Sequence, residues 1–456
     1  MKVGIIGAGT MGLTLAYRLS AAGHDVVVLE ASPQIGGLGT WFDYGDFIWD
    51  KYYHVILQQD SHLLGLIEEL GLSSELRWGE TRTGFLWKGR LISMSNNWEF
   101  LTFPALRFLE KMRLAIGILY VQRIRDPSRL ERTKATEWMK RIFGTRVYQA
   151  IWEPLLESKY GALKAEMPAT LMWATIRRYY STRSRSGGRE RMGFLSLGFK
   201  SLYEAIEQRI MKQGGRIHCS TAATRVDDSR ASAVLVHTVR GPFEVDRLIS
   251  TAPSESLCRI APEESDLLVD NARRPRYLGV VCLSLVLRRP LNPYYVTNLI
   301  QKGFPFTGVI GISNLTGTQK FAGHSLVMLP RYELPESEWF EKSAETIAAE
   351  FLAGLRVFSP DVENNLVRCY MNRERLVQAL WVSNPPGDAR PRRSRTGRVW
   401  NINAELAGRD TLNSNAVVKT ANKAAVEFLS SSAAAADPSL APGRDLARSF
   451  AVAHHN

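Results

Sequence analysis

The first 30 residues alternate between short apolar runs and one helical pattern. Residues 2–6 form a β-rich run, a helical pattern follows through residue 22, and residues 25–29 form a second apolar run. Gly23 supplies the helix stop between them. Short runs rich in branched residues on either side of a helical segment predict a complete β-α-β unit.

Three glycines connect the first strand to the helix. Gly7 permits a tight turn, Gly9 removes a side chain so that the backbone can approach a pyrophosphate, and Gly12 lets the helix pack closely on the strand. The helix N-terminus then offers N–H groups and a positive dipole end to phosphates. Glu30 is placed to accept hydrogen bonds from ribose hydroxyls, and its charge disfavours a 2′-phosphate. The spacing predicts a dinucleotide-binding unit.

This unit alone does not separate a nicotinamide enzyme from a flavin enzyme, because both place an ADP moiety on the same scaffold. A second glycine pair, Gly36 and Gly37, would let another loop approach the same pyrophosphate. Near the C-terminus, a predicted strand at 398–403 is followed by Gly408, Asp410 and a helical run. That segment could present Asp410 to a polyol chain; the alternative is an ordinary glycine turn before a helix.

Taken together, these residues resemble the FAD-dependent amine oxidase and protoporphyrinogen oxidase-like flavoproteins, a superfamily that also contains phytoene desaturases and UDP-galactopyranose mutase. The resemblance extends over most of the chain, and the first and last glycine motifs carry its specificity. The chain looks most like bacterial protoporphyrinogen oxidase-like proteins of unassigned substrate. Other matching segments are residues 50–54, 151–161, 191–199, 249–253 and 304–310.

The resemblance implies an α/β fold, with a discontinuous Rossmann-like FAD/NAD(P)-binding domain and a mixed helical and antiparallel-sheet substrate domain. The composition agrees, because glycine motifs and β-rich runs recur in three separate segments. We expect an FAD-binding domain at 1–80, 190–260 and 395–430, a substrate domain at 81–189 and 261–394, and a flexible low-complexity tail at 431–456.

The resemblance also implies which residues hold FAD. The first loop would contact the pyrophosphate, and the second loop would contact its far side. The segment around residue 223 would contact the adenine, and the segment around residue 251 would form the crossing to the substrate domain. The C-terminal motif would meet the ribityl chain and the flavin ring. No cysteine stands beside that motif, so we expect the FAD to be non-covalent. The implied cofactor-binding residues are Gly7, Gly9, Thr10, Met11, Gly12, Glu30, Ala31, Gly36, Gly37, Leu38, Ala223, Thr251, Pro253, Gly408, Asp410, Leu412 and Asn413.

His54 is the candidate catalytic residue, since it resembles the histidine near the flavin in the mutase branch. A neutral imidazole there could donate to flavin or substrate or serve as a base; the alternative is a histidine satisfied by the backbone. Two departures argue against amine oxidation: Leu38 replaces a common arginine, and no lysine lies between Lys212 and Lys302. His62 is not placed to form a metal site with His54, so metal binding is not expected.

The charge is concentrated rather than spread. The formal net charge is +13, and arginine runs at 177–191 and 390–398 hold most of it. This concentration argues against a broad nucleic-acid-binding face. The runs are either solvated loops or a mouth that attracts phosphate or carboxylate groups, in which case Arg183 and Arg185 would bind substrate.

Residues 98–124 interleave aromatic and aliphatic side chains with arginine and lysine. Such a segment could lie in a membrane interface, but we favour a buried helix pair that caps an apolar cavity. The longest apolar run, at 114–121, is too short to span a bilayer. With unpaired cysteines and no signal-peptide pattern, we expect a cytoplasmic protein with possible peripheral membrane contact. The sequence does not predict its oligomeric state.

The leading hypothesis is an enzyme in which bound FAD accepts a hydride from a small, largely apolar or ring-bearing molecule with an anionic group. Oxygen, a quinone or another carrier would reoxidise the flavin. A second hypothesis is a non-redox flavoenzyme resembling the mutase, acting on a nucleotide sugar. A third is a prenyl-protein escort resembling the GDP-dissociation inhibitors, against which the intact Gly7, Gly9, Gly12 and Asp410 argue.

Overall fold

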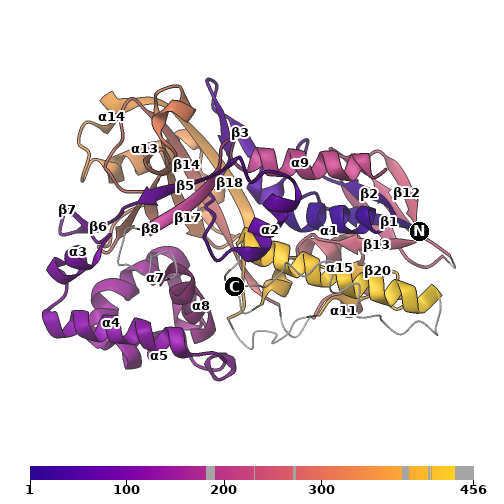
Figure 1. Cartoon of the computed structure of the whole chain (residues 1–456), viewed down its shortest axis with the longest axis horizontal. Helices are drawn as coiled ribbons and strands as arrows, with labels where there is room; N and C mark the ends of the chain where they lie inside the picture. Colours follow the sequence, from indigo (N-terminus) through magenta and orange to yellow (C-terminus); the bar gives the residue numbers. More distant parts are fainter. Residues whose placement is uncertain are drawn as a thin grey trace.

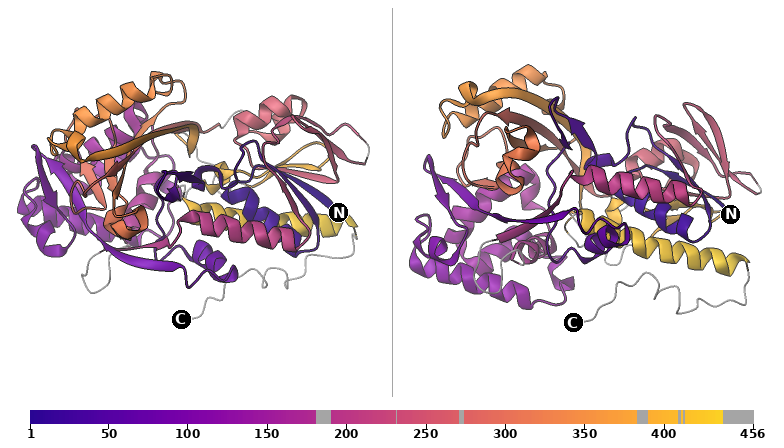
Figure 2. Two further views of the ribbon diagram at one scale, coloured as in Figure 1. Left: turned by 90° about the horizontal axis from the view of Figure 1, so that it is seen from above. Right: turned by 45° about the horizontal axis from the view of Figure 1, so that its top comes forward.

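A computed structural model of the chain describes residues 1–180, 190–230, 232–270, 274–382, 390–408, 411 and 413–436. Two large β-sheets lie beside one another, each with its own helices (Figure 1). A group of helices, α3 to α8, lies below the second sheet in the same view and stays on that side of the molecule in the other views (Figure 2).

The first sheet has six strands in the order β19-β20-β13-β1-β2-β9. Its neighbours pair in parallel, except that β19 runs antiparallel to β20. The sequence expectation of a β-α-β unit is confirmed, with β1 and β2 joined by α1. The strands are β1 (Lys2–Ile6), β2 (Asp25–Leu29), β9 (Arg216–His218), β13 (Arg247–Ser250), β19 (Arg392–Arg393) and β20 (Val399–Asn401).

Both faces of this sheet are covered, because successive side chains of a strand point to opposite faces. In β2, Val26 and Val28 pack under α1 (Thr10–Ala21), α9 (Phe199–Lys212) and α15 (Ser414–Ala436). Val27 and Leu29 belong to the apolar cluster on the other face. That face is covered by α10 (Ser254–Ile260), α11 (Ser265–Leu268) and a small sheet of β10 (Ala223–Asp227), β11 (Val234–Thr238) and β12 (Gly241–Val245).

The second sheet has seven strands in the order β18-β14-β17-β16-β15-β6-β7 and is antiparallel except for the β15–β6 pair. Its long strand β14, second in this order, is buried on both faces, with Leu283 and Leu285 packing toward α13 (Ala344–Leu355) and Cys282 toward the opposite cluster. The strands are β6 (Thr83–Trp87), β7 (Arg90–Ser93), β14 (Arg276–Leu287), β15 (Val296–Leu299), β16 (Gly308–Gly311), β17 (Ser325–Glu333) and β18 (Leu366–Leu380).

Two-stranded ribbons and short helices connect the sheets. β5 pairs with β8, and β3 pairs with β4. A parallel sheet with helices on both faces beside a mixed helical and antiparallel part confirms the predicted α/β fold class, while the domain boundaries stay a prediction. The connecting elements are β3 (Trp41–Asp43), β4 (Ile48–Asp50), α2 (Ser61–Glu69), β5 (Leu76–Thr81) and β8 (Glu190–Leu195).

The helical group contains α3 (Asn97–Thr102), α4 (Phe108–Arg123), α5 (Ala135–Phe143), α7 (Glu153–Tyr160) and α8 (Ala169–Tyr180). The favoured expectation that residues 98–124 form a buried helix pair is wrong for the outer side of α3 and α4. Leu114 and Val121 are buried, but Trp98, Phe108 and Leu109 are 73%, 64% and 79% exposed. Apolar residues lie on both sides of α4, and the pattern alone could not show which side is covered.

The C-terminal helix is longer than expected. The sequence predicted a helical run at 414–429 and a loose tail after it, whereas α15 continues through Ala436. Four consecutive alanines end the described helix, and alanine has the highest helix propensity. The expectation of a loose tail is therefore wrong for residues 431–436, and the remainder of the predicted tail lies outside the described residues.

Candidate functional site

The loop between β1 and α1 has room only for glycine at two positions. Gly7 has a φ of +101°, and its N–H donates to the Leu29 carbonyl oxygen at 2.9 Å. A Cβ at Gly12 would lie 1.9 Å from the Gly7 oxygen, and a Cβ at Gly7 would lie 2.5 Å from Thr251 Oγ1. Helix α1 therefore packs directly on the turn. Its N-cap, Gly9, makes no side-chain capping hydrogen bond, so no side chain screens the helix N-terminus.

The second glycine loop lies against the first, backbone to backbone. The Gly36 N–H donates to the Ala8 oxygen at 2.8 Å, and Gly9 and Gly36 form a parallel bridge. A Cβ at Gly37 would lie 3.0 Å from the Gly9 Cα. These loops and the α1 N-terminus form a cradle without side chains, which fits the diphosphate of a dinucleotide.

Side chains at the edges of this cradle are fixed by tertiary contacts. Thr10 Oγ1 shares a 2.8 Å hydrogen bond with the Tyr203 hydroxyl, and Met11 is buried. Leu38 is partly buried against the aromatic cluster around Tyr44, whereas Ala31 is exposed. Their predicted contacts with FAD stay predictions.

The Glu30 carboxylate is buried and holds two backbone N–H groups. One oxygen accepts from Ala8 N at 2.6 Å, and the other accepts from Ser32 N at 2.8 Å. Glu30 thus fixes the glycine loop, a role that the sequence interpretation did not include. Each carboxylate oxygen has a further lone pair, so the ribose contact stays a prediction.

The segment around Ala223, predicted to contact adenine, lies near the end of β2. The segment from Thr251 to Pro253, predicted to cross between domains, lies near the end of β1. The Thr221 N–H donates to the Glu30 carbonyl oxygen at 2.7 Å, which holds the start of β10 and Ala223 close to β2. The Thr251 hydroxyl donates to the Ile6 oxygen at 2.8 Å, and Pro253 precedes α10.

The C-terminal motif is described only in part. Gly408 has a φ of +53°, and Asn413 Oδ1 accepts from Ala416 N at 3.1 Å at the start of α15. Asn415 Oδ1 accepts from the N–H groups of His62 and Leu63, which ties α15 to α2. The predicted site residues Asp410 and Leu412 lie outside the described residues, as do Arg183 and Arg185.

His54 is nearly enclosed and holds a single tautomer. Its Nδ1 lies 3.0 Å from the Tyr52 carbonyl oxygen, so Nδ1 carries the proton and Nε2 is left as an acceptor. Burial lowers the pKa of His54 to about 4, and the bond to Tyr52 opposes this only in part. The imidazole is therefore neutral at neutral pH. It is bonded to the backbone on one nitrogen and offers an acceptor, not a donor, on the other.

Asp50 lies beside His54, at the end of β4. Its Oδ1 accepts from the Phe199 N–H at 2.7 Å, and its Oδ2 lies 3.8 Å from His54 Nδ1. Burial raises the pKa of Asp50 to about 8, although the Phe199 bond lowers it in part. At neutral pH the carboxyl is mostly protonated, so Asp50 and His54 form a neutral pair. The sequence interpretation passed over Asp50, although it stands four residues before His54.

Tyr53, the residue before His54, belongs to a cluster formed by a tyrosine pair and a lysine. The Tyr53 and Tyr332 hydroxyls share a 2.6 Å hydrogen bond. Lys159 Nζ lies 5.2 Å from the Tyr332 ring centroid and 5.4 Å from that of Tyr160. Burial works against the charge of Lys159, but the tyrosine oxygens around it raise its pKa above the ordinary value. Lys159 comes from α7, outside the Lys212–Lys302 interval that the sequence interpretation considered.

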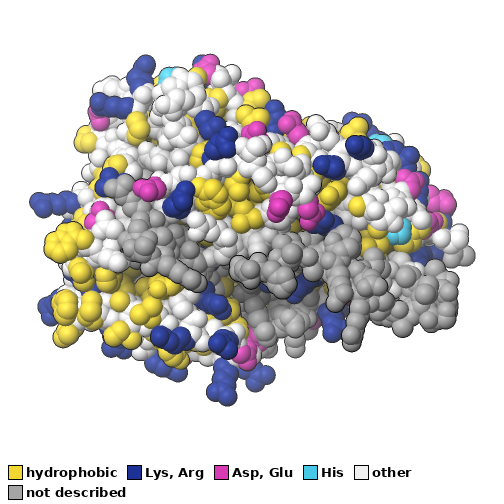
Figure 3. Space-filling view, in the orientation of Figure 1, with side chains coloured by type: hydrophobic (Ala, Val, Ile, Leu, Met, Phe, Trp, Pro, Cys, Tyr) yellow, Lys and Arg dark blue, Asp and Glu magenta, His cyan; other side chains and the backbone are white. Residues whose placement is uncertain are grey.

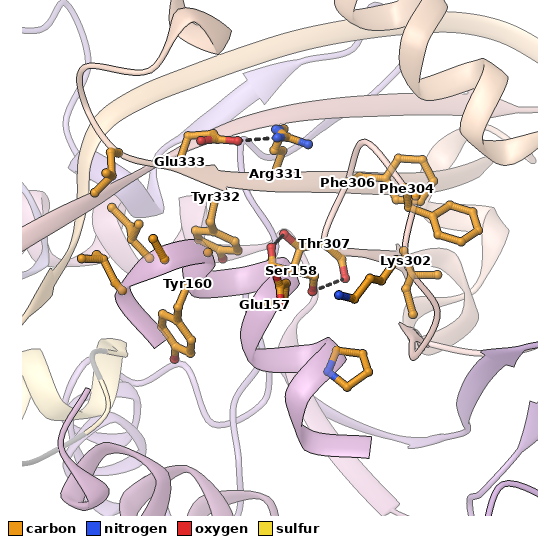
Figure 4. Close-up of a pocket in the computed structure, with 18 of the residues that line it drawn as sticks. Glu157, Ser158, Tyr160, Lys302, Phe304, Phe306, Thr307, Arg331, Tyr332 and Glu333 are labelled. Atoms are coloured by element: carbon orange, nitrogen blue, oxygen red, sulfur yellow. Dashed lines mark hydrogen bonds and ion pairs between the residues drawn. The ribbon is translucent and has the colours of Figure 1, made fainter. Parts of the chain in front are cut away.

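Tyr332 also lines a cavity of about 370 Å³ between α7 and the second sheet (Figure 4). Within it, Arg331 pairs with Glu333 at 2.5 Å. Lys302 is exposed and has no ion-pair partner among the described residues; Figure 4 shows it extending toward Ser158 and Thr307. The apolar and aromatic lining residues are Leu278, Leu299, Phe304, Phe306, Leu334, Tyr160 and Tyr332.

Some arginines of the second run make structural contacts, and a ligand-binding role for the run stays a prediction. Arg398 forms a buried ion pair with Asp228 at 3.0 Å. Arg393 pairs with Glu427 at 3.1 Å, and its guanidinium lies 3.7 Å from the centroid of the Trp400 ring. In the first run, Arg178 pairs with the buried Asp60.

Comparisons with known proteins agree with this geometry. A protein-family model described as flavin containing amine oxidoreductase matches residues 12–384. The 15-cis-phytoene desaturase of Glycine max is 22% identical over 391 residues, which cover 79% of this chain and 66% of that protein.

Solved structures show the same fold. An oxidoreductase from Methanosarcina mazei has a TM-score of 0.70 at 18% identity, with 93% of this chain and 99% of that chain covered. A reduced UDP-galactopyranose mutase has a TM-score of 0.66 at 17% identity, with 94% and 95% covered.

The fold and the cradle define a dinucleotide-binding enzyme of the flavin type. The chain belongs to the flavin containing amine oxidoreductase family. Its cofactor is FAD, and the side-chain-free cradle at Gly7, Gly9 and Gly37 fits the diphosphate of that cofactor. When bound, FAD supplies a two-electron hydride acceptor.

The described residues also bear on metal binding and on membrane insertion. They contain no group of three or more His, Cys, Asp or Glu side chains that could hold a metal ion. Among them there is also no helix with both the length and the apolar character needed to cross a membrane.

Proposed function

We propose that the protein is an oxidoreductase that takes a hydride from a largely apolar or ring-bearing small molecule with an anionic group. The cavity of about 370 Å³ carries this proposal, because its lining is mainly apolar and aromatic. Tyr332 lines it and shares a hydrogen bond with Tyr53, the residue before His54. Lys302 has no ion-pair partner within 4 Å among the described residues and, although the Glu157 carboxylate lies in the same lining, we assign its ammonium group to an anionic group of the substrate.

The residues around the cavity have separate roles in this proposal. The aromatic side chains exclude water and orient the substrate, and FAD, when bound, would accept a hydride from a substrate carbon. A pKa of about 4 makes His54 a weak base at neutral pH. We therefore assign its Nε2 to accepting a hydrogen bond from the substrate or the flavin, while the substrate proton leaves to solvent.

The test is anaerobic reduction. The purified protein should be yellow, with one FAD per chain released intact by acid or heat. Ring-bearing carboxylates or phosphates should bleach the oxidised flavin spectrum, whereas their neutral amide or alcohol analogues should do so with a higher KM. A mutase-type enzyme would leave the flavin oxidised with all of these compounds and act on a nucleotide sugar only after prior reduction. A folded preparation without flavin would contradict both.

Charge variants test the anionic group. Lys302→Gln, and separately Arg183→Gln with Arg185→Gln, should raise KM with little change in flavin content, and the wild-type KM should rise with added salt. Lys212→Gln is the matched control, since Lys212 is an exposed lysine on α9. A KM that is independent of salt and unchanged in both variants would show that the substrate is not held by charge.

A further inference from the structure

The outer sides of α3 and α4 form an exposed apolar surface, which we call the α3–α4 face. Its side chains range from 43% exposed for Leu101 to 79% for Leu109. Figure 3 shows hydrophobic side chains gathered over this part of the molecule, at the lower left, with Lys and Arg along its lower edge. The face consists of Trp98, Leu101, Phe108, Leu109, Ile116, Leu119 and Tyr120.

Helix α4 is apolar on both sides, although only one side packs on the protein. Leu114, Gly117 and Val121 face the core at helical spacing. Leu109, Ile116 and Tyr120 recur at the same spacing on the outer side and are 79%, 67% and 53% exposed. A helix that is apolar all round is normally covered all round, and a patch of this kind marks an interaction site.

The two helices form one continuous ridge. The buried Lys111 on α4 donates from Nζ to the Leu101 oxygen at 2.5 Å, which holds the end of α3 against the first turns of α4. Phe103 and Leu106 anchor the connection in the helical core. Trp98 and Leu101 are thus exposed apolar residues on a helix that is held against α4.

The charges around this ridge are basic. Residues 97–125 carry five basic and two acidic side chains, a net charge of +3. Both acids are engaged locally: Glu110 pairs with Arg146 at 2.7 Å, and Glu99 accepts from Ser95 N at 2.7 Å. Arg107, Arg123 and Arg125 are exposed at the ends of α4, whereas the exposed Arg113 donates to the Arg141 and Ile142 carbonyl oxygens.

We propose that the α3–α4 face docks on an anionic lipid bilayer, with both helices lying in the interface. Protruding Trp, Phe and Leu side chains would enter the acyl boundary, and the flanking arginines would reach the phosphate headgroups with their long side chains. Charge complementarity favours an anionic lipid surface. The contact is peripheral, because no described helix is long and apolar enough to span the bilayer.

Vesicle sedimentation of the full FAD-loaded chain tests this proposal. Binding should be at least about tenfold tighter to vesicles of phosphatidylcholine with phosphatidylglycerol than to phosphatidylcholine alone. The variant L109E/I116E should lose at least tenfold of that binding. The matched control is M211E/V239E, which removes side chains that are 62% and 64% exposed on the other half of the molecule. It should bind like the wild type.

Further variants keep the test decisive. If L109E/I116E fails to fold, as judged by flavin content and circular dichroism, L109S/I116S replaces it. R123Q/R125Q should weaken binding and reduce its salt dependence. The proposal is overturned if the wild type does not bind anionic vesicles. It is also overturned if L109E/I116E and M211E/V239E lose vesicle binding equally. Conversion of an oligomer to a monomer by L109E/I116E, without vesicle binding by the wild type, would identify a self-association surface instead.

Discussion

The glycine loops beside α1 and the region around His54 differ in how their polar groups are satisfied. In the loops, the partners are close in sequence: Glu30 holds Ala8 and Ser32, and Gly36 bonds to Ala8. Around His54, the imidazole bonds to the nearby Tyr52 oxygen, whereas Asp50 and Tyr53 bond to distant segments at Phe199 and Tyr332. Burial raises the pKa of Asp50 and lowers that of His54. The cofactor side is thus a local, pre-formed cradle. The other side is assembled by tertiary packing, and we expect it to determine which substrate reacts.

The largest expected effect is the loss of FAD binding when a cradle glycine is replaced. Gly12→Ala would place a methyl group 1.9 Å from the Gly7 oxygen, so the loop must shift. We expect a protein without measurable FAD, destabilised by about 1–3 kcal/mol. In Gly9→Ala the new Cβ would meet only the Gly37 Cα, at 3.8 Å. That variant should lose FAD affinity while its apoprotein melts like the wild type. Equal FAD content in both variants and the wild type would show that the cradle has been misassigned.

Glu30 tests the local network itself. Glu30→Ala leaves the Ala8 and Ser32 N–H groups without their acceptor, and we expect FAD binding to weaken by about 1–3 kcal/mol. Glu30→Gln keeps one acceptor oxygen and should lose less. Flavin fluorescence on dilution measures the release. Unchanged FAD retention in Glu30→Ala would show that this carboxylate does not contribute to FAD binding.

In the region around His54, we expect the free energy of unfolding to depend on pH. The pKa of Asp50 rises from 3.8 to about 8 on folding, so its stabilising contribution is fully present below about pH 4 and is lost as pH rises through 8. From about pH 6.5 to 8, the wild-type free energy of unfolding should fall by up to about 1.4 kcal/mol per pH unit. Asp50→Asn keeps an oxygen for the Phe199 N–H and should remove this slope.

The chosen pH window isolates Asp50. The lowered pKa of His54 affects stability in the opposite direction, as pH falls from 6.5 toward 4. Urea titrations at several pH values measure both. Identical slopes for the wild type and Asp50→Asn above pH 6.5 would contradict a protonated Asp50 in the folded state.

The smallest expected effect is at the tyrosine pair. Tyr53→Phe removes the 2.6 Å hydrogen bond to Tyr332 and should cost about 0.5–1.5 kcal/mol of stability. Since neither hydroxyl belongs to the cradle, FAD content should stay unchanged, while the KM of any substrate that bleaches the flavin should change. A loss of FAD in Tyr53→Phe would mean that the two regions are not separable.

The same contrast explains what the sequence could predict. Both strands of the first β-α-β unit match their expected bounds, since strand, turn and helix signals there are local. The family resemblance supplied the cofactor. The pairing of Tyr53 with Tyr332 spans 279 residues, and Lys159 reaches the same cluster from the helical insertion. Such contacts depend on how the two parts of the chain pack and leave no local signal.

The outer side of α4 shows a second kind of failure. Its hydrophobic positions predicted a helix, and a helix is present. The pattern has apolar residues on both sides, so it does not specify which side the protein covers. The expectation of burial was wrong at Trp98 and Leu109 for that reason.

The strand order of the first sheet determines when each strand can pair during synthesis of the chain. β1 lies between β2 and β13, and β13 in turn pairs with β20. Val3 can therefore pair with β13 only after Arg247 has been synthesised, and Leu248 can pair with β20 only after Val399 has been synthesised. At about 5–20 residues per second, a ribosome needs roughly 10–50 s to make the 240 or so residues between Val3 and Arg247. During that time the edge of β1 is unpaired. A nascent chain of this architecture therefore depends on slow, long-range closure, and shortened chains that end before β20 should aggregate rather than fold.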